Sequence, residues 1–132
     1  TKGRIVNVSS GAANLALANI SAYCASKAAL NHFTAVLAAE EPSITALTVR
    51  PGVVDTGMQT FIRTEGPKAM PSDQVRYYTA LKERGELEHP EIPARSIAWL
   101  TLHAPAAFSG KFFDYDDPRI SRMSVEAFGE HL

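Results

Sequence analysis

Alternating blocks of apolar and polar residues predict strands and helices in turn along this chain. Residues 4–10, RIVNVSS, and residues 43–50, SITALTVR, are rich in β-branched and apolar side chains, which is typical of short buried strands. Residues 21–40 carry apolar side chains at helical spacing without Gly or Pro, which predicts the longest helix of the chain. We expect Ser21 to cap this helix and Pro42 to end it.

The second half of the chain continues the alternation with shorter elements. We predict a loop over 53–71 with one helical turn near Met58–Arg63, followed by a helix over 73–84 that Ser72 caps. A further helix runs from Pro93 to near Pro105. A strand over 110–115 comes next, and a loose polar tail begins at Asp116. Strands that alternate with helices pair in parallel through right-handed crossovers. The predicted fold class is therefore α/β, with a three-stranded parallel sheet and covering helices.

Composition and charge exclude several classes of protein. The 132 residues are 45% hydrophobic and 20% charged, and their formal net charge of −1 predicts no nucleic-acid partner. No apolar run approaches the roughly 20 residues that span a bilayer. The single Cys24 and the scattered histidines predict neither disulfides nor a metal site. No targeting signal is visible, so we expect a cytoplasmic protein that binds neither membrane nor metal.

Tyr23 and Lys27 carry the clearest chemistry in the sequence. They lie four residues apart on the predicted long helix, which places both on one face. An ammonium beside a phenol favours the phenolate, so Tyr23 is suited to pass a proton to or from an alcohol oxygen. Ser10 ends the first strand, at the edge where open α/β sheets bind ligands. The three side chains together predict carbonyl reduction or alcohol oxidation.

Each of these residues also has a simpler interpretation. Tyr23 and Lys27 can form a solvated helix pair worth a few tenths of a kcal/mol. Serine after a strand is more often a turn residue than a catalytic one. The pattern alone leaves both interpretations open.

A third segment, VRPGVVDTGM at residues 49–58, follows the second strand. The turn at Pro51 and Gly52 opens the backbone, so that the main chain of Val54 and the hydroxyl of Thr56 can meet a planar amide such as a nicotinamide carboxamide. A plain turn after a buried strand explains the same residues. Arg50 and Asp55 flank the turn and are typical of surface ion pairs.

The segments RIVNVSS, YCASKAAL and VRPGVVDTGM, in this order and spacing, resemble the short-chain dehydrogenase/reductase family. The resemblance covers essentially the whole chain and the carboxyl-terminal half of the family's Rossmann-type, doubly wound parallel sheet. The segments YCASKAALNHF, LKERGEL and SGKFFDYDDP resemble most closely the branch that includes sepiapterin reductase and fungal benzil-reductase-like enzymes.

The resemblance implies a role for each matching residue. Ser10 would polarise the substrate carbonyl, Tyr23 would be the proton donor or acceptor, and Lys27 would bind the nicotinamide ribose and make Tyr23 more acidic. Val54 and Thr56 would contact the nicotinamide after the turn that Pro51 and Gly52 shape. Asp114, in the last strand, corresponds to a substrate-anchoring carboxylate; a solvent-facing carboxylate is the alternative.

The same resemblance implies cofactor and partners. The branch prefers NADP, with NAD possible, and acts on small-molecule carbonyl compounds. The helix over 21–40 usually contributes to a homodimer interface in this family.

The glycine-rich dinucleotide turn of the family has no counterpart in residues 1–132, so this stretch is expected to be the catalytic half of an NAD(P)-binding domain. The beginning at Thr1 rather than Met agrees with that expectation. Two functions remain open: an NADP-dependent carbonyl reductase when full-length, or a truncated, non-catalytic remnant that serves as a structural or pairing module. Sugar-nucleotide epimerases share the Tyr-x-x-x-Lys spacing, but VRPGVVDTGM and the short carboxyl-terminal region argue against them.

Overall fold

A computed structural model describes residues 2–130 of the chain. The backbone divides into two compact units, residues 2–52 with 93–130 and residues 53–92, and each is described by itself. The elements of the first unit are β1 (Gly3–Val8), the short 3-10 helix η1 (Gly11–Ala13), α1 (Ser21–Glu40), β2 (Ile44–Arg50), α4 (Glu91–His103, of which residues 93–103 belong here), η3 (Ala106–Phe108), β3 (Phe112–Asp114) and α5 (Pro118–Phe128).

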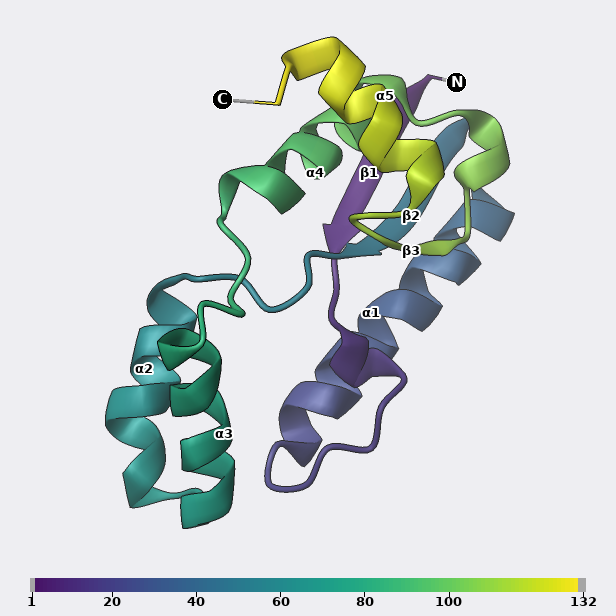
Figure 1. The fold of residues 1–132 in the computed structure, drawn as a ribbon. Helices are drawn as coiled ribbons and strands as arrows, with labels where there is room; N and C mark the ends of the chain where they lie inside the picture. Colours follow the sequence, from purple (N-terminus) through teal and green to yellow (C-terminus); the bar gives the residue numbers. More distant parts are fainter. Residues whose placement is uncertain (1, 131–132) are drawn as a thin grey trace. The chain divides into compact units, whose positions relative to one another are not determined.

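The first unit is built on a parallel sheet of three strands in the order β1-β2-β3 (Figure 1). The predicted α/β fold class is confirmed. The central strand β2 is buried at every position from Thr45 to Val49, because helices cover both faces of the sheet.

Alternation along β2 assigns side chains to the two faces. Leu47 and Val49 belong to the core cluster with Trp99 and Leu100 of α4, Phe113 of β3 and Ile120 of α5. Thr48, between them, faces the opposite way together with its register partner Asn7 of β1, whose side-chain amide donates to the Thr34 hydroxyl of α1 at 2.9 Å. α1 therefore covers one face, and α4 with α5 covers the other.

The second unit contains two antiparallel helices, α2 (Gly57–Glu65) and α3 (Ser72–Glu83), joined through η2 (Gly66–Lys68). Its buried side chains are few, with Leu81 and Gln59 among them. The single helical turn predicted near Met58–Arg63 is in fact a helix of nine residues.

Three local predictions were wrong. Ser21 and Ser72 are the first residues of their helices and not the caps, which are Ile20 and Pro71 without side-chain cap bonds. The tail from Asp116 is not loose, because Pro118–Phe128 forms α5. Asp117 caps that helix by accepting a hydrogen bond from the Arg119 amide at 3.0 Å, and Pro at its first position is favourable.

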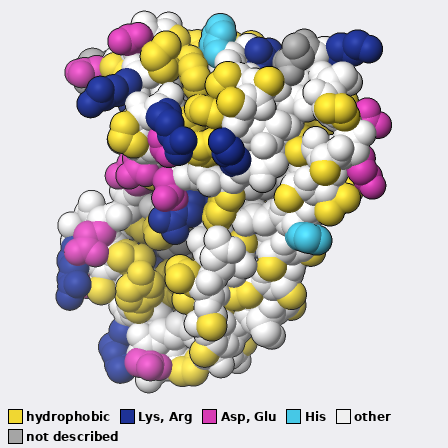
Figure 2. All heavy atoms as spheres, turned by 90° about the vertical axis from the view of Figure 1, so that its right-hand side faces the viewer, with side chains coloured by type: hydrophobic (Ala, Val, Ile, Leu, Met, Phe, Trp, Pro, Cys, Tyr) yellow, Lys and Arg dark blue, Asp and Glu magenta, His cyan; other side chains and the backbone are white. Residues whose placement is uncertain are grey.

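Apolar side chains also reach the surface, between acidic and basic ones (Figure 2). Among the large apolar side chains, Phe61 and Phe33 are the most exposed, at 64% and 60%. No helix among residues 2–130 is both long enough and apolar enough to cross a membrane.

Candidate active site

Ser10 stands just beyond the carboxyl end of β1 and caps η1. Its backbone is extended, and its Oγ accepts a hydrogen bond from the Ala12 amide at 3.1 Å. That bond occupies an oxygen lone pair and leaves the hydroxyl proton available for donation. Ser10 thus presents an oriented hydroxyl donor at the end of the strand.

Tyr23 and Lys27 lie in the first two turns of α1, on one face as their spacing predicts. The Lys27 Nζ donates to the Val8 carbonyl at 3.0 Å and stands 5.8 Å from the centroid of the Tyr23 ring. Val8 is the last residue of β1. The lysine therefore ties the amino-terminal part of α1 to the strand end that leads into Ser10, and the Tyr23 ring lies beside it.

Gly52 turns the chain after β2. Its φ of +76° lies in the left-handed region, where a side chain is strained, and a Cβ at this position would approach the Tyr115 ring to 3.0 Å. Both the conformation and the close aromatic neighbour require glycine. The left-handed conformation of Gly52, directly after Pro51, therefore has a structural cause.

Val54 and Thr56 belong to the second unit. Val54 forms a parallel bridge with Glu88, in which the Glu88 amide donates to the Val53 carbonyl at 2.8 Å and the Asp55 amide donates to the Glu88 carbonyl at 2.9 Å. In such a bridge the N–H and C=O of Val54 itself point away from Glu88. Thr56 caps α2 through its backbone without a side-chain cap bond, so its hydroxyl is not used there.

The Asp55 carboxylate accepts a hydrogen bond from the Lys82 ammonium of α3 at 2.5 Å. This bond is the main reason that the pKa of Asp55 lies below its ordinary value. Together with the Glu88 bridge, it holds the segment around Val54 inside the second unit.

Asp114 ends β3, beside Arg50 at the end of β2 in the parallel register. Its carboxylate accepts a hydrogen bond from Arg50 Nε, and both side chains are partly exposed. Sequence reasoning singled out Asp114 and treated Arg50 as a surface residue. The sequence feature that could have identified Arg50 as a site residue is its place directly before Pro51, at the carboxyl end of a buried strand.

The structure thus gathers several of the selected residues at one edge of the first unit. Ser10, Tyr23, Lys27 and Asp114 lie at or near the carboxyl ends of the strands. The roles assigned to these residues stay predictions. Among residues 2–130, no three His, Cys, Asp or Glu side chains are placed to hold a metal ion.

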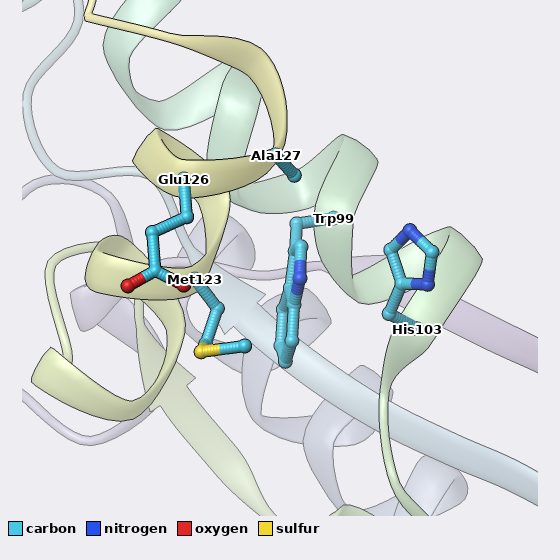
Figure 3. Close-up of a pocket in the computed structure, with 5 residues that line it drawn as sticks. All are labelled: Trp99, His103, Met123, Glu126 and Ala127. Carbon is cyan, nitrogen blue, oxygen red and sulfur yellow. The ribbon is translucent and has the colours of Figure 1, made fainter.

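A shallow pocket of about 360 Å³ lies elsewhere, between α4 and α5 (Figure 3). Trp99 and His103 line it from α4, and Met123, Glu126 and Ala127 line it from α5. Trp99 is only 8% exposed and belongs to the core cluster. None of the residues selected from the sequence lines this pocket.

Comparison with known proteins places these features in a family. Residues 1–66 match the family model described as short chain dehydrogenase. A crystal structure of a short chain dehydrogenase/reductase from Saccharomyces cerevisiae is 42% identical, with a TM-score of 0.87 over 92% of this chain and 49% of that one. The crystal structure of the angucycline ketoreductase LanV, with NADP bound, is 28% identical, with a TM-score of 0.65 over 86% and 42%.

Two curated relatives have names that state a reaction. A benzil reductase of Saccharomyces cerevisiae, named as forming (S)-benzoin, is 43% identical over 89% of this chain and 46% of its own length. Sepiapterin reductase of Bos taurus is 37% identical over 86% and 41%. The chain spans about half the length of the relatives it matches. Together with the parallel sheet, these matches show that the chain belongs to the short-chain dehydrogenase family.

Proposed function

We propose that the full-length protein is an NADP-dependent carbonyl reductase of the short-chain type. The observation that carries this proposal is the Lys27 ammonium, which bonds to the Val8 carbonyl at 3.0 Å beside the Tyr23 ring. Through this contact, the Tyr23 phenol and the Lys27 ammonium lie near the end of β1, the strand that leads into Ser10, at one edge of the sheet. The names of the benzil and sepiapterin reductases support carbonyl reduction.

Each of the three residues has a distinct task in this reaction. The Ser10 hydroxyl donates a hydrogen bond to the substrate carbonyl oxygen, and its own bond from Ala12 keeps it oriented. Tyr23 delivers a proton to that oxygen as negative charge develops there. The Lys27 ammonium, held by the Val8 carbonyl, stands beside the ring from which the proton leaves.

The chain offers contacts that fit a nicotinamide cofactor. Within the second unit, the main-chain groups of Val54 that point away from Glu88 and the Thr56 hydroxyl, which makes no cap bond, suit a carboxamide. Within the first unit, the Lys27 ammonium suits a ribose hydroxyl. Pro51 and Gly52 shape the turn that leads to these contacts. A nicotinamide held by these contacts would supply the hydride for the carbonyl carbon. The NADP in the LanV ketoreductase structure supports NADP over NAD.

Partner and location follow the same family pattern. Phe33 and Val36 of α1 are exposed at 60% and 40%, and these apolar side chains support pairing with a second copy through helix 21–40. A structural neighbour 41% identical to this chain, from Saccharomyces cerevisiae, is described as a cytoplasmic protein, which supports a cytoplasmic location.

The Tyr23→Phe substitution tests the proposal in the full-length protein. Removal of the hydroxyl removes the proton donor, so turnover of a diketone such as benzil should fall by about 10²-fold or more. Affinity for NADPH, measured by fluorescence titration, should stay within about twofold. Tyr77→Phe on α3 removes an exposed phenol and is the matched control. Wild-type turnover in the Tyr23→Phe protein would refute the proposed role.

A further inference from the structure

The guanidinium of Arg50 occupies the carboxyl edge of the sheet, where open α/β folds bind ligands. Arg50 is the last residue of β2, and its register partner Asp114 is the last residue of β3. The Arg50 Nε donates to the Asp114 carboxylate. This charge-assisted bond fixes the direction of the guanidinium at the strand ends.

Both side chains face the α1 side of the sheet. Val49 and its register partner Phe113 belong to the core under α4 and α5, so the next residues, Arg50 and Asp114, project from the opposite face. That is the face on which α1 carries Tyr23 and Lys27. The ion pair and the proton-transfer residues therefore lie on one side of the sheet, at its carboxyl edge.

The guanidinium also reaches the loop that carries Ser10. A Cβ built on Gly11 would lie 2.9 Å from Arg50 Nη1, so Arg50 packs over the residue that directly follows Ser10. Glycine at position 11 is what leaves room for this approach. Arg50 thus spans from β3 to the Ser10 loop.

The side chain of Arg50 is partly accessible. Its Nε donates to Asp114 and its Nη1 lies over Gly11, while 42% of the side chain is exposed, so the guanidinium can still meet a ligand. A guanidinium presents its hydrogens in a planar fork that suits an oxygen acceptor held at a fixed place. Because Asp114 balances the charge, the fork suits a neutral carbonyl as well as a carboxylate.

We propose that Arg50 is a specificity-determining residue, which donates to a second oxygen of the substrate beside the carbonyl oxygen held by Ser10 and Tyr23. The favoured substrates are compounds with a ketone or carboxylate oxygen adjacent to the reactive carbonyl. Asp114 acts through Arg50 as a positioning residue and does not anchor the substrate itself. This inference rests on the proposed function.

The test compares substrates that differ by one oxygen, using the full-length protein. The ratio of kcat/KM for 1-phenyl-1,2-propanedione to kcat/KM for propiophenone is measured in wild type and in Arg50→Met. The two substrates differ in intrinsic reactivity, but that difference is the same for both proteins and cancels when the two ratios are compared. The variant ratio should fall by about 10-fold or more, because one charged donor to the second oxygen is lost. Phenylglyoxylate, tested in parallel, should lose efficiency by a similar factor, because its carboxylate would accept from the same guanidinium.

Further variants separate a contact from a structural effect. Arg50→Lys keeps a cation for Asp114 but loses the planar fork, so its ratio should fall while its thermal stability stays near wild type. Asp114→Asn should raise KM for the diketone with a smaller change in kcat. This substitution loosens the orientation of the Arg50 guanidinium but does not remove it. Arg119→Met, in a second Arg–Asp pair on α5, should leave the ratio unchanged.

Two outcomes would overturn the inference. If Arg50→Met and Arg50→Lys both keep the wild-type ratio while Tyr23→Phe abolishes turnover, Arg50 does not select the substrate and the proposed function stands. If Tyr23→Phe keeps wild-type turnover, the proposed function fails and the role of Arg50 falls with it.

Discussion

At the residue scale, Lys27 links local spacing to tertiary geometry. Its four-residue separation from Tyr23 is a property of the helix alone, but its bond to Val8 depends on how α1 docks beside β1. A lysine that flexes freely would lose side-chain entropy whenever it assisted a reaction. The bond to a backbone carbonyl orders the ammonium in advance.

Lys27→Met should therefore impair binding and chemistry together. Loss of the ammonium removes the proposed ribose contact and the positive charge beside the Tyr23 ring. We expect KM for NADPH to rise and kcat to fall, each by about 10-fold or more. Steady-state kinetics of the full-length protein measure both. Lys111→Met, which changes an exposed lysine before β3, should alter neither, and unchanged kinetics in Lys27→Met would argue against the assignment.

Gly52 provides a stability test at the same scale. Gly52→Ala places a Cβ in the left-handed region and against Tyr115, so the free energy of unfolding should fall by about 1–2 kcal/mol. Gly57→Ala is the matched control, because a Cβ there meets nothing within 4 Å and the residue opens α2. Urea unfolding of both variants gives the comparison, and an equal loss in the two would exclude a conformational cause at Gly52.

At the scale of elements, α5 shows what pattern reading can miss. The tail looked polar and loose, yet Ile120 and Ser124 are almost fully buried. The buried Arg95 of α4 donates to the carbonyls of Gly129 and Glu130 at 2.7 and 2.6 Å, which secures the end of the helix. Asp117 followed by Pro118 is a sequence signal for the start of a helix. Arg95, which binds the carbonyls at the other end of α5, lies far away in the sequence.

Asp117 should make the stability of α5 depend on pH. The Arg119 side chain, and then its amide, hold the pKa of Asp117 below its ordinary value of 3.8. The stabilisation is therefore present above pH 3.8 and is lost as pH falls through the lower, folded-state value. Asp117→Ala should cost about 1 kcal/mol at pH 7 and less at pH 2. Thermal unfolding at both pH values measures this, and an equal cost at both would contradict the capping role.

At the scale of the whole molecule, β1 is an edge strand among the described residues. Its partner β2 lies on one side, and Ile5 and Val8 are exposed at 37% and 43%. An unpaired strand edge with apolar neighbours is a surface on which further strands can pair. The matched relatives are about twice as long as this chain.

A polypeptide of residues 1–132 expressed by itself should accordingly self-associate and bind NADPH weakly. The open edge of β1 favours association, and the family's phosphate-binding glycine turn is not within these residues. Sedimentation at several concentrations and NADPH fluorescence test the two expectations. Submicromolar NADPH affinity in a monomeric polypeptide would contradict both and would show that the cofactor is held by other means.

The sequence by itself determined the α/β class, the bounds of α1 and the spacing that puts Tyr23 and Lys27 on one helix face, since these depend on periodicity and breakers close in the chain. Tertiary structure alone decided that Lys27 meets Val8, that Arg95 closes α5 and that Arg50 pairs with Asp114 over Gly11. These contacts join residues 19 to 64 positions apart, and no local pattern encodes such distances. Parallel pairing and helix docking bring those residues together, because they fix which strand ends share an edge and which side chains share a face.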